Sequence, residues 1–136
     1  MRSMRLLLAI PAILALAGCA GATVTPSPTE PAGPRVIEIT ASDDLKFTPA
    51  TVSVKAGEAV IFRVKNTGAI VHEFMVGPSD QVNADGGDAA KELEDIEGGQ
   101  SKDLPFTFGT TGTFSFACHV PGHFEAGMKG DVTLGS

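Results

Sequence analysis

The sequence predicts an all-β fold, a sandwich or barrel of many short strands joined by turns. Short segments rich in valine, isoleucine, threonine and phenylalanine recur after residue 35, and glycine, proline or asparagine separates them. In residues 51–54 (Thr-Val-Ser-Val), polar and apolar side chains alternate, as in a strand with one buried face. No long segment of this region repeats with the period of a helix.

Each predicted strand ends at a turn signal, and the intervening segments are expected to be loops. Phe47 is expected to be a buried anchor within a turn before Pro49. The polar, acidic segment 77–103 is expected to be mostly a solvated loop, with one short helix at 88–94 that has Asp88 as its N-cap. The predicted strands are residues 36–40, 51–54, 59–65, 70–76, 104–108, 113–117 and 131–134.

The N-terminus is predicted to be a targeting segment outside the folded domain. Arg2 and Arg5 precede an apolar run at 6–16 that is too short to span a bilayer comfortably. The run ends in Leu-Ala-Gly-Cys, which resembles the processing site of bacterial lipoproteins. This resemblance implies that a signal peptide at 1–18 is removed and that Cys19 is acylated. An ordinary signal peptide with an incidental cysteine is the alternative.

Two acyl chains on Cys19 would hold the protein on a membrane surface, because stable anchoring generally needs two signals. Residues 19–34 are rich in proline and threonine, so we expect a semi-rigid tether. Residues 35–136 form the predicted folded domain, which would face the periplasm or another extracytoplasmic space.

Charge and cysteine content restrict the function further. The formal net charge is −6, and removal of the signal peptide with its two arginines lowers it to about −8. This balance disfavours nucleic acid and favours a basic partner. Only two cysteines are present, so acylation of Cys19 leaves Cys118 without a disulfide partner. In an exported protein, such a cysteine suggests a reactive thiol, intermolecular pairing or a metal ligand.

Residues 118–128 carry a metal-ligand pattern. Cys118, His123 and Met128 stand at Cys-x4-His-x4-Met spacing, and His72 lies far upstream on a predicted strand. Two imidazoles, a thiolate and a weak axial thioether make up the ligand set of a blue-copper electron-transfer site. Strand parity places His72 and Phe74 on one inward face.

On these residues the chain resembles the cupredoxins, specifically the small plastocyanin/auracyanin-type blue copper proteins, over residues 35–134. The resemblance implies a Greek-key β-sandwich of about seven to eight strands and one type 1 copper held by His72, Cys118, His123 and Met128. It also implies a one-electron carrier without catalytic turnover, in which copper cycles between Cu(II) and Cu(I) through the exposed edge of His123. The family commonly has asparagine directly after its first histidine ligand, whereas this chain has Glu73.

Several alternatives stay open at this point. His119 is expected to be a surface histidine that points away from the copper, with a second metal contact or a partner contact as the alternatives. Met75 and Glu73 fall on the opposite strand face from His72, so neither is expected to be a ligand. Copper delivery or resistance is the alternative function, and a copper-free interaction domain is weaker still. Catalysis is disfavoured, because one domain with three histidines cannot hold a trinuclear centre.

The expected partner is a redox protein, such as a cytochrome or a membrane oxidase or reductase, and it would be basic. The acidic run at 80–97 is expected to be a solubilising loop, and docking of basic cytochromes is the alternative. The protein is expected to be a monomer.

Overall fold

The computed structural model describes residues 33–136, and the predicted signal peptide and Cys19 lie outside these residues. Within the described range, no helix is long and apolar enough to cross a membrane. The elements in this range are β1 (Arg35–Ser42), β2 (Lys46–Thr48), β3 (Thr51–Lys55), β4 (Ala59–Asn66), β5 (His72–Pro78), α1 (Ser79–Asn83), β6 (Lys91–Ile96), β7 (Ser101–Thr107), β8 (Phe114–Ala117) and β9 (Lys129–Gly135).

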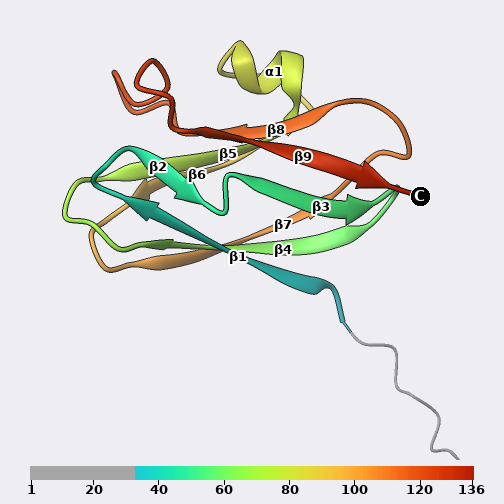
Figure 1. The fold of residues 1–136 in the computed structure, drawn as a ribbon, viewed down its shortest axis with the longest axis horizontal. Helices are drawn as coiled ribbons and strands as arrows, with labels where there is room; N and C mark the ends of the chain where they lie inside the picture. The colour runs from blue at the N-terminus through green and yellow to red at the C-terminus, as the bar shows by residue number, and fades with distance from the viewer. Residues whose placement is uncertain (1–32) are drawn as a thin grey trace, which may run out of the picture. The chain divides into compact units, whose positions relative to one another are not determined.

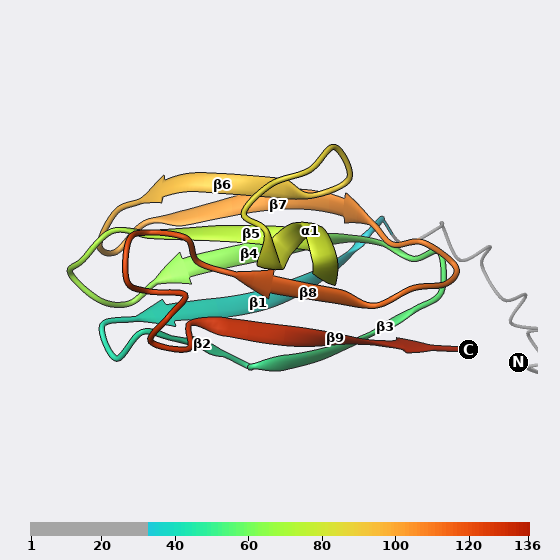
Figure 2. The same ribbon diagram turned by 90° about the horizontal axis from the view of Figure 1, so that it is seen from above.

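The strands form two mixed sheets that pack face to face (Figure 1). One sheet has the order β2-β1-β4-β7, and the other has the order β3-β9-β8-β5-β6. β1 runs parallel to β4 and β3 runs parallel to β9, whereas the other neighbours are antiparallel. The short helix α1 lies on the outer face of the five-stranded sheet, over β5 and β8 (Figure 2). The predicted all-β sandwich is therefore confirmed.

Phenylalanine fills the space between the sheets, since the chain has no tryptophan or tyrosine. Phe74 lies at the centre of this core and is fully buried. Its ring centroid is 5.4 Å from that of Phe47, 5.3 Å from that of Phe62 and 5.4 Å from that of Phe116. Edge and tilted arrangements of this kind add to the free energy gained by burial. The core ends at the metal-ligand loop, where Cys118 and Met128 join the same buried cluster.

Every predicted strand segment overlaps an observed strand, but the sequence missed two strands. Phe47 is buried as expected, yet it belongs to the short strand β2, which pairs with β1. The second missed strand, β6, occupies the acidic segment in which a helix was expected at 88–94. That helix prediction was wrong, because residues 91–96 pair antiparallel with β5 instead. A largely charged strand at a sheet edge has little apolar pattern of its own, so the ladder with β5 determines its conformation.

A short helix does occur in the segment 77–103, but at Ser79–Asn83 rather than at 88–94. Val82 is its one buried residue and packs against Met75 and Ala117 on the outer face of the sheet. The loop that follows is held by Gln81, whose Oε1 accepts hydrogen bonds from the backbone N–H groups of Ala89 (2.9 Å) and Ala90 (3.1 Å). Most of segment 77–103 is therefore secondary structure or a loop held by hydrogen bonds, whereas a mostly solvated loop was expected.

Candidate metal centre

Three of the four predicted ligands meet at one end of the sandwich. His72 begins β5, Cys118 directly follows β8, and His123 lies in the loop between β8 and β9. One donor atom from each of these side chains lies within 4.8 Å of the others. The Cys118 Sγ is 3.4 Å from the Nδ1 of His123. All three residues are buried, so the cluster is an interior site of the domain.

The backbone closes the ligand loop on itself and brings Met128 to the same place. The N–H of Cys118 donates to the carbonyl of Met128 (3.0 Å), and the N–H of Met128 donates to the carbonyl of His123 (3.0 Å). Gly122 and Gly127 have φ values of 86° and 95°, a region that glycine adopts without steric cost. Met128 is fully buried. Each of the three loop residues is thus bonded through its backbone to another of them.

The ring of His72 has no hydrogen-bond partner within residues 33–136. Both of its nitrogens, Nδ1 and Nε2, are buried without a donor or acceptor. Leaving a buried polar group unpaired costs about 1–3 kcal/mol, which a metal ion bound to the ring would offset. Burial, with a smaller contribution from His123, lowers the pKa of His72 and favours the neutral imidazole that ligates metals. The unpaired nitrogens therefore fit a metal ligand.

Cys118 is a free, buried cysteine in the described part of the chain. Burial raises the pKa of its thiol, although the backbone N–H of Glu73 opposes this by donating to Sγ at 3.3 Å. A thiol must lose its proton to bind a metal, so binding here releases a proton and depends on pH. A thiolate, two imidazoles and a thioether suit copper, whereas hard cations prefer oxygen ligands.

The prediction that His119 is a surface histidine was wrong. Its side chain is only 9% exposed, and its Nε2 lies 2.9 Å from the carbonyl oxygen of Val82 in α1. The ring also stacks on Phe124, with centroids 5.0 Å apart and an interplanar angle of 18°. The Nζ of Lys129 is 4.8 Å from the centre of the Phe124 ring. His119 therefore joins α1 to the ligand loop, a role that appears only once the two segments are placed in space.

Neither of the two doubtful side chains joins the cluster, as parity predicted. Met75 packs with Val82 and Ala117 on the opposite face of the sheet. Glu73 is half-buried among other acidic groups, and burial, followed by the charges of Asp85, Asp95 and Glu94, raises the pKa of its carboxyl. Burial, followed by the charges of Glu73, Asp85 and Glu94, raises the pKa of Glu92.

Asn66 and Asp43 support the loop that leads to His72, and the sequence analysis did not single them out. Asn66 ends β4 and is fully buried, and its amide bonds to the backbone of that loop. Asp43 is exposed and accepts hydrogen bonds from the N–H groups of Ala69 and Ile70. The sequence signal at Asn66 is only the turn-like Asn-Thr-Gly at 66–68, because its burial and its partners appear only in the fold.

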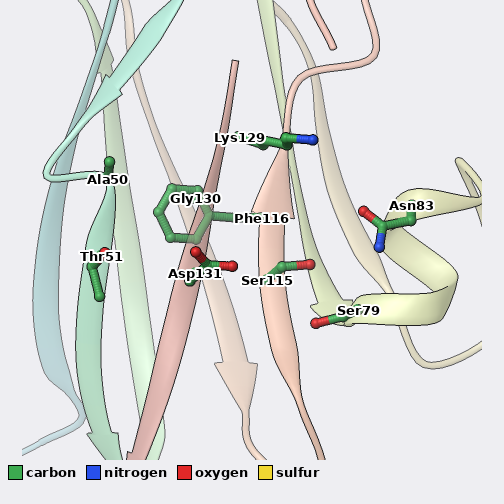
Figure 3. Close-up of a pocket in the computed structure, with 9 residues that line it drawn as sticks. All are labelled: Ala50, Thr51, Ser79, Asn83, Ser115, Phe116, Lys129, Gly130 and Asp131. Carbon is green, nitrogen blue, oxygen red and sulfur yellow. The ribbon is translucent and has the colours of Figure 1, made fainter. Parts of the chain in front are cut away.

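A polar groove on the outer face of the five-stranded sheet is separate from these ligands. It lies between α1, β8, β9 and β3 (Figure 3). Its lining includes Thr51, Ser79, Asn83, Ser115, Lys129 and Asp131. The Ser115 hydroxyl is buried and has no hydrogen-bond partner among the described residues. The cluster of His72, Cys118 and His123 brings metal-binding side chains together, and it is the candidate functional site.

The chain is similar to known copper proteins over this whole region. The profile of the family described as copper binding proteins, plastocyanin/azurin family, matches residues 35–135. The copper-resistant cuproprotein CopI of Rubrivivax gelatinosus is 36% identical over 109 residues, which cover 74% of this chain and 66% of that protein. The chain thus spans just under two thirds of the length of this relative.

Two further similarities are to a plastocyanin by sequence and to a blue copper protein by structure. Plastocyanin B'/B'' of Nicotiana tabacum is 39% identical over 98 residues, covering 68% of this chain and 93% of the plastocyanin. The structure of auracyanin A, a "blue" copper protein from Chloroflexus aurantiacus, matches this chain with a TM-score of 0.64 at 25% sequence identity. The match covers 76% of this chain and 100% of the auracyanin chain.

Proposed function

Because the chain belongs to the plastocyanin/azurin family of copper-binding proteins, we propose that it is a type 1 copper protein that carries one electron at a time. The observation that carries this proposal is the closed, buried cluster of His72, Cys118 and His123 beside Met128. These four side chains would hold the ion, and copper would supply a Cu(II)/Cu(I) couple when bound. The protein would have no catalytic turnover of its own.

The chain's part in this function is to keep the ligands still. Ordered backbone bonds fix Cys118, His123 and Met128 relative to one another, and β5 fixes His72. Ligands held in fixed positions suit a metal ion that gains or loses an electron while it keeps the same ligands. The buried surroundings also exclude water from the ligands.

His123 is the ligand closest to solvent, so it is the proposed point of electron entry and exit. It is 9% exposed, whereas His72, Cys118 and Met128 are 0% exposed. Its neighbours Pro121 and Gly122 lie on the surface. A partner that packs over this loop would therefore reach the His123 ring before any other ligand.

The first test is an optical titration of the purified protein with Cu(II), with Cys118→Ala as the control. An intense thiolate-to-copper absorption that disappears on reduction and is absent from the control supports the proposal. Stoichiometric binding without this absorption would contradict the type 1 assignment. Rapid electron exchange with a soluble redox mediator would then be measured by stopped flow.

Copper delivery or resistance is the second candidate function, and the 36% identity to a copper-resistant cuproprotein favours it. The two candidates differ in how fast copper leaves the site. A carrier keeps its copper through many redox cycles, whereas a delivery protein passes Cu(I) to an acceptor. Transfer of Cu(I) to a chelator within seconds would favour delivery, and retention over hours would favour the carrier.

The proposed partner is a basic redox protein, and the edge strand β6 offers it an acidic surface. Glu92, Glu94 and Asp95 lie on this strand, and β5 and the loop after α1 add Glu73 and Asp85. Replacing Glu92, Glu94 and Asp95 by their amides should slow electron transfer to a basic cytochrome, most strongly at low salt. The matched control is a triple amide variant at Glu38, Asp80 and Asp131. Equal rates in the two variants would remove this docking role.

The proposed location is a membrane surface of the cell envelope, with acylated Cys19 as the anchor. This part of the proposal depends on the sequence of residues 1–19 alone. A Cys19→Ser variant should move from the membrane fraction to the soluble fraction, and an unchanged distribution would contradict the lipid anchor.

A further inference from the structure

One buried side chain holds the loop that leads to His72, through hydrogen bonds to backbone groups. Asn66, the last residue of β4, is fully buried. Its Nδ2 donates to the carbonyl of Ile70 (2.7 Å) and to the carbonyl of Ile96 (2.8 Å). Its Oδ1 accepts the N–H of Gly68 (2.9 Å). One amide thus uses both of its donor hydrogens and its acceptor on backbone groups.

These backbone groups lie on both sides of His72. Ile70 precedes His72 by two residues along the chain, and Ile96 lies directly opposite His72 in the β5–β6 pairing. The pairing shifts register between His72 and Phe74, so the regular ladder is interrupted next to the ligand. Asn66 supplies hydrogen bonds at the place where the ladder provides fewer.

Asp43, in the turn after β1, also holds this loop by hydrogen bonds, from its solvent-exposed side. The Asp43 carboxylate accepts the N–H of Ala69 (2.9 Å and 3.0 Å to its two oxygens) and the N–H of Ile70 (3.2 Å). A side chain at Gly68 would overlap this carboxylate, so glycine is required for the approach. The loop is thus held between a buried amide and an exposed carboxylate.

The His72 ring itself has no such support. A histidine ligand commonly donates its second ring N–H to a carboxylate or a carbonyl, which fixes the orientation of the ring. Both ring nitrogens of His72 lack a partner within the described residues. The position of this ligand must therefore come from the backbone that carries it and from core packing.

We propose that Asn66 is the positioning residue for His72, acting through the backbone of Ile70 and Ile96, with Asp43 as its outer counterpart. This inference rests on the proposed copper function of His72 and adds the residue that sets its place. Loss of a group that orients a metal ligand typically costs 10–100-fold in metal affinity. A comparable loss is expected here, although Asn66 bonds to the backbone and forms no hydrogen bond with the His72 ring.

The test compares Asn66→Ala with Val64→Ala in the full chain. Val64 is also fully buried on β4, two residues earlier on the same face, so its truncation destabilises the same strand without touching the loop. We expect Asn66→Ala to weaken Cu(II) binding by about 10–100-fold and to shift the thiolate-to-copper absorption, while Val64→Ala changes neither. Equal effects in the two variants would show that Asn66 only stabilises the fold, and would overturn the proposal.

A second, exposed pair keeps the test valid if Asn66→Ala fails to fold. Asp43→Ala removes the outer fastening, and Asp44→Ala removes the adjacent charge, which bonds to Ser42 instead of the loop. Asp43→Ala should raise the rate of copper release severalfold over Asp44→Ala. Identical release rates would contradict the role of Asp43, and with an unfolded Asn66→Ala they would overturn the proposal.

A measurement without copper separates this inference from the proposed function. In NMR spectra of the copper-free protein, the ring signals of His72 should shift or broaden in Asn66→Ala and Asp43→Ala but not in the two controls. If the wild-type protein binds no copper while these signals respond, the proposed function fails and the positioning role stands. If the signals do not respond, the positioning role fails whatever the copper result.

Discussion

Replacing His119 tests whether α1 and the ligand loop are energetically coupled. The Nε2 of His119 lies 2.9 Å from the carbonyl of Val82, which also accepts the N–H of Asp85 at 3.3 Å. That carbonyl keeps a partner after the substitution, so the lost hydrogen bond should cost about 1 kcal/mol. The stacked ring of Phe124 adds about 0.5–1.5 kcal/mol. His119→Ala should therefore lower the free energy of unfolding by about 2 kcal/mol.

Two further variants separate the hydrogen bond from the ring stacking. His119→Phe retains an aromatic ring against Phe124 and loses the bond to α1, so it should cost about 1 kcal/mol. Combining His119→Ala with Phe124→Leu forms a double-mutant cycle, whose coupling free energy should be about 0.5–1.5 kcal/mol.

Urea unfolding of the copper-free protein, followed by far-UV circular dichroism, measures these differences. Midpoints should shift at constant m-value, because the same surface is exposed in every variant. A wild-type stability for His119→Phe, together with a coupling below about 0.3 kcal/mol, would refute the assignment of His119 as a link between α1 and the loop.

Three other predictions concern acid stability, thiol reactivity and core packing. The hydrogen bond from Arg35, followed by that from the Lys55 N–H, lowers the pKa of Glu58 from 4.5 to about 2. The stabilising effect of the Glu58 carboxylate is present above pH 4.5 and is lost as the pH falls toward 2. Glu58→Gln should therefore flatten the dependence of the unfolding free energy on pH in this range. An unchanged slope would contradict the role of Glu58. Burial raises the pKa of the Cys118 thiol, so the copper-free native protein should react with a thiol reagent at pH 8 at least about tenfold more slowly than the urea-unfolded chain, and equal rates would be inconsistent with the buried site. Phe74→Ala should cost about 3–5 kcal/mol in urea unfolding, against less than about 0.5 kcal/mol for the exposed Val36→Ala, and a small loss at Phe74 would contradict its central place in the core.

The ligand set could be predicted from the sequence because its information is local. Cys118, His123 and Met128 lie on one short loop, so their spacing can be recognised without knowledge of the rest of the fold. His72 was assigned as the second imidazole of this ligand set, and strand parity placed it on the inward face with Phe74. The fold class followed in the same way from short alternating segments and the turns between them.

The remaining errors come from contacts between distant segments. Strand β6 carries mostly charged residues, so its conformation depends on its pairing with β5, from which α1 and a loop separate it in the sequence. His119 was assigned to the surface because nothing in the sequence places α1 above it. Asn66 reads as an ordinary turn residue until the backbone of Ile96 is brought beside it. The targeting segment and Cys19 lie outside the described residues and stay predictions.

Under the proposed function, the His72 ring, which has no hydrogen-bond partner in residues 33–136, would link the lifetime of the protein to copper supply. A folded state that binds a ligand gains stability as the concentration of free ligand rises above the dissociation constant. Without copper, the buried imidazole has no hydrogen-bond partner among the described residues, and the folded state would gain nothing of this kind. Molecules without copper would therefore unfold more often, and proteases remove unfolded chains. The amount of protein that persists in the cell would then follow the metal available to it, without a dedicated copper sensor.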